Sequence, residues 1–343
     1  MKVSVVIPTY NDEGTIAATV HSALAQKFEG GFEVIVVNDG STDGTRGILA
    51  KFGDRIRMID QENLGVSAAR NAGIRAASGE YIAPLDGDDT WTEDKLQKTV
   101  PVLDKNPACV AVYSNVIVLD GAGSELWCCV PPEFQHSPTL DEMLDRVWVY
   151  LPSATVIRRD TLLAIGGYSE EFAAGHYGFE DTFIMLLVRE RGGIMFLPET
   201  LARRPFREFA TKYANRLRSR RFEIDSAEAF SEFERRFEGS TVFARLVREH
   251  FGARGRKIAK SAVHGAASEL VGVGLMAMHD GNRGFAGRCY RASIRYRPLM
   301  LKTYCRLGWA MLPGKVAQRL SPMLSPGLRR SLTGPPVLEE RPQ

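Results

Sequence analysis

The 343-residue sequence predicts an α/β fold with a mostly parallel sheet, followed by a basic, mainly helical C-terminal region. Short apolar segments alternate with amphipathic ones over the first third of the chain, which is typical of a parallel sheet covered by helices. From about residue 203 strand patterns almost disappear and arginine becomes frequent. Because 44% of the residues are hydrophobic, the chain can bury a proper core, which excludes disordered and collagen-like classes. We therefore expect two regions, 1–210 and 211–343.

The first 90 residues alternate regularly between strand and helix patterns. Apolar runs predict strands, and apolar residues three or four positions apart predict helices. Because segment 34–37 is apolar throughout, we expect it to be buried on both faces. The expected elements are strand 3–7, helix 15–25, strand 34–37, helix 45–52, strand 56–59, helix 66–77 and strand 81–85.

The alternation becomes less regular beyond residue 89. Here the patterns predict helix 94–104, strand 110–119, helix 140–147, strand 153–157, helices 160–165 and 182–190, and strand 194–197. The sheet is thus expected to end near residue 200.

The net charge of +3 conceals an uneven distribution. Residues 1–200 carry 16 basic and 29 acidic side chains, a difference of −13, whereas residues 201–343 carry 28 and 12, a difference of +16. A basic segment suggests an anionic partner. No nucleic-acid motif accompanies it, so we do not expect nucleic acid. The alternatives are a solvated helical surface and an anionic membrane surface, the latter favoured by Trp309 and apolar residues beside Lys302 and Arg306.

Targeting patterns and cysteines favour a cytoplasmic location. No run of 18 apolar residues predicts a membrane-spanning helix. The first apolar segment ends at Pro8 without a cleavage site, so it predicts a strand rather than a signal peptide. The five cysteines form no C-x-x-C pair and no zinc-site spacing. We expect a cytoplasmic protein, peripheral on the cytoplasmic face of the membrane if the basic region binds lipid.

Two acidic groups follow predicted strands, where open α/β sheets bind ligands. Asp39 can accept a hydrogen bond from a base or ribose, or can form a turn that caps the next helix. Asp86, Asp88 and Asp89 repel one another unless a cation neutralises them, and Mg²⁺ or Mn²⁺ prefers such oxygen ligands. An acidic helix start is the alternative. No G-x-G-x-x-G follows the first strand, which argues against a dinucleotide site.

A third acidic pair, Glu180 and Asp181, opens the helix predicted at 182–190. The helix dipole would stabilise a carboxylate there, but either residue could also act as a general base. The preceding segment 166–178 is rich in glycine, which is common in mobile substrate loops. His176 lies in this segment and has either a substrate-binding or a structural role.

These segments together resemble glycosyltransferase family 2. The motifs are V-V-I-P-T-Y-N at 5–11, V-V-N-D-G-S-T-D at 36–43, N-L-G at 63–65 with A-R-N-A-G at 69–73, G-E-Y-I at 79–82 leading into D-G-D-D at 86–89, and E-D at 180–181. They occur in the family's order and cover residues 1 to about 210. The resemblance implies the GT-A fold and an inverting, metal-dependent transferase that uses a nucleotide diphosphate sugar.

The resemblance also implies roles for individual residues at the donor. The positions that match the family's donor-nucleotide site are Pro8, Thr9, Tyr10, Asp39, Arg70, Asp86 and Asp88. Within the D-x-D cluster, Asp88 and Asp89 are the candidates for direct contact with Mg²⁺ or Mn²⁺. The donor would be a UDP- or dTDP-linked sugar.

At the acceptor, the resemblance implies that Asp181 is the catalytic base, with Glu180 beside it. Trp91 and His176 are the candidates for contact with the acceptor. The acceptor would be a hydroxyl of a glycan or lipid-linked sugar in cell-surface polysaccharide synthesis.

One segment departs from the family's pattern. Many relatives carry a histidine after the last strand of the sheet, whereas the comparable residues 203–209 read R-R-P-F-R-E-F. Arg204 or Arg207 could bind the diphosphate there, because a guanidinium recognises phosphate well. The missing histidine could also weaken the dependence on metal.

Two other functions are compatible with the acidic groups. A nucleotidyltransferase also uses paired aspartates and a metal, but its glycine-rich, lysine-containing loop after the first strand is missing. A non-catalytic binding or scaffold module would keep the fold, but the carboxylates at all three positions argue against it.

Overall fold

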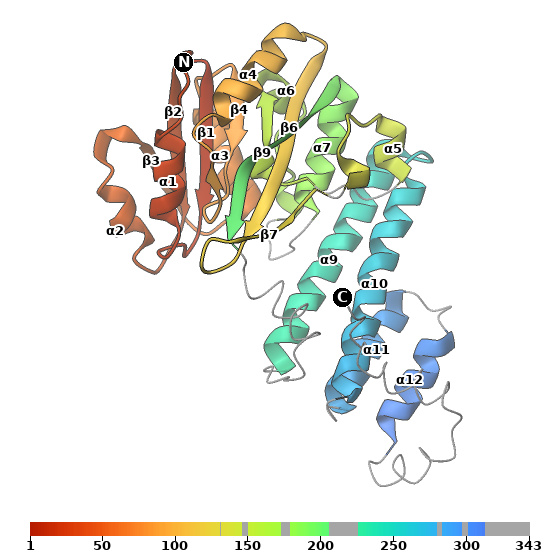
Figure 1. Cartoon of the computed structure of the whole chain (residues 1–343). Helices are drawn as coiled ribbons and strands as arrows, with labels where there is room; N and C mark the ends of the chain where they lie inside the picture. The colour runs from red at the N-terminus through yellow and green to blue at the C-terminus, as the bar shows by residue number, and fades with distance from the viewer. Residues whose placement is uncertain are drawn as a thin grey trace, which may run out of the picture. The chain divides into compact units, whose positions relative to one another are not determined.

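The computed structural model describes residues 1–130, 132–145, 150–172, 179–205, 226–279, 283–296 and 301–312. The chain divides into two compact units (Figure 1). The first consists of Met1–Arg207 and Leu246–Ile258, and the second of Glu208–Arg245 and Ala259–Gln343.

A nine-stranded mixed sheet forms the centre of the first unit (Figure 1). Its strands lie in the order β3-β2-β1-β4-β8-β6-β9-β5, with β7 paired to β6. The first four strands and the β6–β9 pair are parallel, whereas β5, β7 and β8 run antiparallel to their neighbours. The bounds are β1 Val3–Thr9, β2 Phe32–Asp39, β3 Arg57–Gln61, β4 Tyr81–Pro84, β5 Thr90–Trp91, β6 Cys109–Leu119, β7 Glu125–Cys128, β8 Thr155–Arg158 and β9 Gly193–Pro205.

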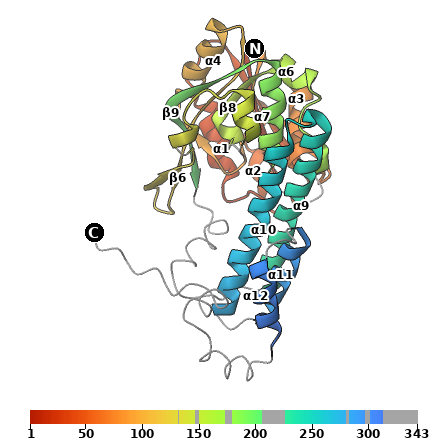
Figure 2. The same cartoon turned by 90° about the vertical axis from the view of Figure 1, so that its right-hand side faces the viewer.

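Helices cover both faces of this sheet (Figures 1 and 2). On one face Val5 of β1 belongs to the same apolar cluster as Ile16 of α1 and Val100 of α4. On the other face α3 lies so close to β1 that a Cβ at Gly73 would be 2.3 Å from Cγ1 of Val6. The helices of this unit are α1 Ile16–Leu24, α2 Thr45–Ala50, α3 Val66–Ala76, α4 Lys95–Lys105, α5 Leu140–Asp145, α6 Arg159–Ala164 and α7 Glu180–Arg191.

The structure confirms the expected α/β architecture and every element predicted in the first 90 residues, with ends that differ by at most two residues. Three later expectations were wrong or incomplete. The strand expected at 153–157 begins at Thr155, because Pro152–Ala154 forms a 3₁₀ turn. The strand expected at 194–197 extends to Pro205, because β6 pairs with it over that length. The short strands β5 and β7 were not predicted.

The C-terminal region is helical in its described parts. Its helices are α9 Ser226–Phe251, α10 Arg256–His279, α11 Arg283–Tyr296 and α12 Leu301–Met311. Within the second unit α11 packs on α10, where Ser293 Oγ donates a hydrogen bond of 2.9 Å to the carbonyl of Ala267. Of the helices that the structure describes, none has the length and apolar character needed to span a membrane.

The turn between α9 and α10 belongs to the first unit. Basic side chains in this turn and at the adjoining helix ends pair with acidic side chains of α5 and α7. The pairs are His250 with Glu190 at 2.6 Å, Arg254 with Asp141 at 3.0 Å and Lys257 with Asp145 at 2.8 Å. A chain that ends near residue 210 would therefore lack contacts of the unit that carries the sheet.

Lys95, at the start of α4, is completely buried. Its Nζ has no hydrogen-bond partner among the described residues and lies 5.2 Å from the centre of the Trp91 ring. Burial lowers the pKa of Lys95 from 10.5 to about 7. Because a buried amino group without a hydrogen bond is unfavourable, Lys95 should weaken the fold.

Replacing Lys95 with methionine should raise the free energy of unfolding by on the order of 4 kcal/mol near neutral pH. In the wild type the unfolded chain binds more protons between pH 7 and 10.5 than the folded chain, so wild-type stability rises with pH over this window. The advantage of Lys95→Met should therefore be largest at and below pH 7 and shrink toward pH 10.5. Urea denaturation across this range measures it, with exposed Lys105→Met on the same helix as the control. An advantage that does not change with pH would contradict the burial of a neutral lysine.

Candidate active site

The D-x-D turn follows β4 and is fixed to the start of α1. The carbonyl of Gly87 accepts hydrogen bonds of 3.0 Å from the hydroxyls of Thr15 and Thr19. A Cβ at Gly87 would lie 2.5 Å from Oδ2 of Asp12, so the turn approaches the end of β1 closely. These contacts hold the aspartates on either side of Gly87 in one orientation.

The carboxylates of Asp86, Asp88 and Asp89 form one cluster, with one oxygen of each within 4.8 Å of the others. Asp88 and Asp89 are buried, and Asp86 is partly exposed. Ser153, in the turn before β8, links two of them. Its hydroxyl donates to Oδ2 of Asp89 at 2.6 Å and accepts from the backbone N–H of Asp86 at 3.1 Å.

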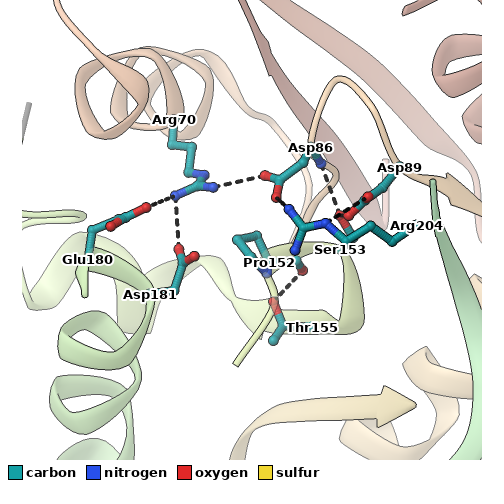
Figure 3. Close-up of polar contacts among 9 residues, drawn as sticks. All are labelled: Arg70, Asp86, Asp89, Pro152, Ser153, Thr155, Glu180, Asp181 and Arg204. Atoms are coloured by element: carbon teal, nitrogen blue, oxygen red, sulfur yellow. Dashed lines mark hydrogen bonds and ion pairs between the residues drawn. The ribbon is translucent and has the colours of Figure 1, made fainter. Parts of the chain in front are cut away.

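Arg204, near the end of β9, supplies positive charge to this cluster (Figure 3). Its guanidinium lies 3.6 Å from Oδ1 of Asp89 and 3.8 Å from Oδ2 of Asp86. Burial lowers the pKa of Arg204, but the carboxylates of Asp89, Asp86 and Asp88 outweigh this effect and raise it. Arg204 therefore stays charged beside the cluster.

The cluster fits a divalent cation. The pKa of Asp89 is raised to about 8, mainly by burial; Arg204 lowers it, and the charges of Asp86 and Asp88 raise it. One guanidinium thus does not fully compensate the buried carboxylates, and additional positive charge would favour their ionised forms. Oxygen ligands at this spacing are of the type that Mg²⁺ and Mn²⁺ bind.

Arg70 of α3 links this cluster to the start of α7 (Figure 3). Its guanidinium donates to Oδ1 of Asp86 at 2.8 Å and to Oδ1 of Asp181 at 2.9 Å, and it lies 3.8 Å from Glu180. The Arg70 side chain is only 3% exposed, and its guanidinium lies 5.0 Å from the centre of the Tyr168 ring. The expected catalytic base and the D-x-D motif, which are far apart in sequence, therefore share one buried cation.

Asp181 is the more accessible member of its pair, with a side chain 24% exposed against 9% for Glu180. Burial raises the pKa of Asp181 well above its usual value, Arg70 opposes this shift, and Glu180 adds to it. A carboxylate with a raised pKa is a stronger proton acceptor when it is ionised. The geometry is therefore compatible with the role of proton acceptor that the sequence predicts for Asp181.

The expected nucleotide residues lie at the ends of β1 and β2. Pro8 and Thr9 are buried in β1, whereas Tyr10 is 46% exposed and available to a ligand. Both carboxylate oxygens of Asp39 accept hydrogen bonds from the segment before α3. The donors are Gln61 Nε2 at 2.7 Å and the backbone N–H groups of Leu64 at 2.9 Å and Gly65 at 2.8 Å. Asp39 therefore shapes the start of α3 in this structure.

The structure contradicts one acceptor candidate. Trp91 is only 4% exposed, and its indole N–H donates to the carbonyl of Ser153, so its ring is part of the core and does not face an acceptor. His176 and Arg207 lie outside the described residues. Ser153 and Tyr168 were missed, because neither belongs to a motif in the sequence. Both enter the site only through contacts with distant segments.

Comparison with known proteins decides the family. The model of glycosyl transferase family 2 matches residues 4–163, which contain β1 to β8 and the D-x-D cluster. Residues 4–163 are therefore a glycosyl transferase family 2 domain. The expected resemblance to family 2 is thereby confirmed for this domain, and the fold shared with solved structures confirms the GT-A fold.

Curated relatives of the matched domain are glycosyltransferases, and solved structures share its fold. TuaG of Bacillus subtilis, a glycosyltransferase assigned by name to teichuronic acid biosynthesis, is 35% identical over 46% of this chain and 63% of its own length. The Escherichia coli UDP-Glc:alpha-D-GlcNAc-diphosphoundecaprenol beta-1,3-glucosyltransferase WfgD is 40% identical over 34% of this chain and 47% of its own. S. aureus TarS 1-349, solved with UDP-GlcNAc, shares the fold with a TM-score of 0.55 and 19% identity over 90% of this chain and 87% of that one.

The matches cover only part of the length of each relative. This chain spans 44% of RP339 of Rickettsia prowazekii and 63% of TuaG. The similarity to RP339, TuaG and WfgD thus covers about half of the length of each of these proteins.

Replacing Arg70 with methionine should lower the free energy of unfolding by about 3–5 kcal/mol at neutral pH, because it leaves buried carboxylates without their cation. In this variant the pKa of Asp181, already raised by burial, should rise further because Arg70 no longer opposes the shift. The folded chain would then bind more protons than the unfolded chain, so the loss of stability should grow as the pH rises above about 4. Urea denaturation at several pH values tests this, with exposed Arg75→Met on α3 as the control. Equal losses for the two variants would show that Arg70 does not balance these charges.

Proposed function

We propose that this protein is an inverting, metal-dependent glycosyltransferase. It would move a sugar from a UDP- or dTDP-linked donor to a hydroxyl of a glycan or lipid-linked acceptor in cell-surface polysaccharide synthesis. The observation that carries the proposal is the link from Asp181 through Arg70 to Asp86, which puts a proton acceptor beside the D-x-D cluster. Family membership and the names of the relatives TuaG and WfgD support the reaction class and the kind of pathway.

At the donor, the exposed ring of Tyr10 and the adjoining ends of β1 and β2 would bind the nucleotide base, with Asp39 holding the turn beside it. Arg204 would bind the diphosphate, because it already lies against Asp86 and Asp89. The TarS structures with UDP and UDP-GlcNAc support a uridine donor for the shared fold.

Asp88 and Asp89 would hold Mg²⁺ or Mn²⁺, with Asp86 beside them toward the ribose. When bound, the ion would stabilise negative charge on the departing diphosphate. A neighbour in fold, the Pyrobaculum calidifontis mannosyltransferase PcManGT, was solved with GDP-Man and Mn²⁺, which supports a metal in this class of fold.

In the reaction, Asp181 would take the proton of an acceptor hydroxyl, and the hydroxyl oxygen would attack the anomeric carbon. The bond from this carbon to the diphosphate oxygen breaks as the new glycosidic bond forms, so the configuration inverts. Arg70 would keep Asp181 oriented and would oppose the pKa increase that burial causes. Glu180 would stay beside it as a second carboxylate near the same guanidinium.

The basic C-terminal region would bring the enzyme to an anionic membrane surface on the cytoplasmic side, where a lipid-linked acceptor would be available. The excess of basic residues after residue 200 supports this part of the proposal. The proposed location is cytoplasmic, as the targeting patterns and cysteines of the sequence favour.

The proposal is tested with a panel of UDP- and dTDP-sugars and octyl glycoside acceptors, with Mn²⁺, Mg²⁺ or EDTA. We expect release of nucleoside diphosphate that depends on acceptor and metal, and NMR of the first product should show inverted anomeric configuration. Release of pyrophosphate would instead indicate a nucleotidyltransferase. Retained configuration would exclude the in-line mechanism, and no turnover with any donor would favour a binding module.

Replacing Asp181 with asparagine should lower kcat by a factor of about 10²–10⁴, the usual contribution of a general base, because asparagine cannot accept the proton. Steady-state kinetics with the best donor from the panel measures this, and isothermal titration with UDP checks that the donor site is intact. Exposed Asp160→Asn on α6 is the matched control. A kcat within threefold of the wild type would exclude Asp181 as the base.

A further inference from the structure

Trp127, on the edge strand β7, is a large aromatic side chain that is 47% exposed. A single exposed apolar residue is common on protein surfaces and carries no function by itself. The position of this one is defined by strand pairing. Val118 of β6 is the register partner of Trp127 on one side and of Arg204 on the other. Because register partners point to the same face of a sheet, Trp127 and Arg204 share a face about 10 Å apart.

Cys129 supports this placement independently. It lies two residues after Trp127, and its backbone N–H donates to the carbonyl of Val116 at 2.7 Å, so the pairing with β6 continues to this point. Burial is the main cause of the raised pKa of the Cys129 thiol, and Arg204 and Asp89 are the next charges that act on it. The segment that carries Trp127 therefore runs toward the D-x-D cluster.

The hairpin between β6 and β7 is held in a defined shape. Oδ1 of Asp120 accepts hydrogen bonds of 2.8 Å from the backbone N–H groups of Ala122 and Ser124, and the N–H of Asp120 donates to the carbonyl of Ser124 at 2.9 Å. The ring of Trp127 is thus presented on an ordered strand, which lowers the entropy cost of binding a ligand.

The order of strands puts this hairpin on the side of the D-x-D cluster opposite the nucleotide residues. β2 and β1, which carry Asp39 and Pro8, lie on one side of β4, whereas β6 and its partner β7 lie on the other. The D-x-D turn follows β4 itself. A donor with its base at β1 and β2 and its diphosphate at the cluster would therefore leave the β7 side to the acceptor.

The charges of the hairpin favour a neutral ligand. Glu125 on β7 is exposed, and Asp120 closes the turn, so the nearest charged groups along the hairpin are acidic. They would repel an anionic lipid surface. The apolar face of a sugar ring, by contrast, can stack on an indole while its hydroxyls stay in water.

We infer that Trp127 is a stacking platform for a sugar ring of the acceptor. This inference deepens the proposed glycosyltransferase function and rests on it for the nature of the ligand. Trp127 would set the position of the acceptor by apolar contact, and Asp181 and Arg204 would act on the reacting groups.

The test uses the full chain with UDP and Mn²⁺ and four probes: octyl β-glucoside, octyl β-galactoside, octyl α-mannoside and octyl N-acetyl-β-glucosaminide. Saturation-transfer NMR should show ring protons of at least one probe in contact with the protein. Trp127→Ala should raise the Kd of that probe about tenfold, and Trp127→Phe should raise it less, because phenylalanine retains a smaller stacking surface.

Leu126→Ala is the matched control, because Leu126 is 43% exposed on the same strand and its side chain points to the opposite face. It should leave the Kd of the probe unchanged. Equal Kd values for Trp127→Ala and the wild type, or no saturation transfer to any probe, would overturn the inference. An increased KM for the donor without an effect on the acceptor would assign the ring to the donor sugar and would also overturn it.

Failure of this inference and failure of the proposed function give different results. If glycoside binding needs Trp127 but the protein turns over no nucleotide sugar, the proposed transferase function is wrong and the inference about Trp127 stands. If the protein turns over a nucleotide sugar and Trp127→Ala does not change the KM for the acceptor, the transferase function stands and the inference about Trp127 is wrong. Reduced sedimentation of Trp127→Ala with phosphatidylglycerol vesicles, at unchanged glycoside Kd, would assign the ring to lipid instead.

Discussion

The pairing of buried Arg70 with Asp86 and Asp181 is the constraint on which the rest of the site depends. A buried ion is tolerated only when its charge and hydrogen-bonding groups are satisfied, so these three side chains must come together in the folded chain. They come from α3, the turn after β4 and the start of α7. One guanidinium therefore fixes the relative positions of the two carboxylates that the proposed reaction uses.

The wider site has an excess of negative charge. Five carboxylates (Asp86, Asp88, Asp89, Glu180 and Asp181) surround two guanidinium groups, those of Arg70 and Arg204. If all were ionised, the sum would be −3, and a diphosphate would add further negative charge. Burial already raises the pKa values of Asp89 and Asp181, which shows how poorly this environment tolerates more anions. In the proposed reaction, binding of a nucleotide diphosphate would then be favoured by a divalent cation that binds with it.

The sequence was most informative where structure is local. The apolar run at 34–37 and the helical spacing at 66–77 depend on neighbours a few residues away, and both elements are present in the structure. Motif order likewise indicated Arg70, Asp86 and Asp181 as site residues, but nothing in their spacing indicated that Arg70 bridges the other two. Ser153 and the extension of β9 to Arg204 could not be predicted, because each depends on partners far away in the chain. Trp91 was misjudged for the same reason, since its burial follows from contacts with α1, α4 and the turn at Ser153.

Some basic residues of the positive half of the sequence form ion pairs with acidic residues of the negative half. Arg254, in the turn between α9 and α10, and Lys257, at the start of α10, pair with Asp141 and Asp145 of α5. These two basic residues belong to the positive half of the sequence and their partners to the negative half, yet all four lie in one compact unit. Part of the positive charge of the second half is therefore neutralised by ion pairs within this unit, although exposed pairs of this kind each contribute little to stability. The charge available to an anionic surface is smaller than the sequence sum of +16, and it must come from basic residues outside this turn.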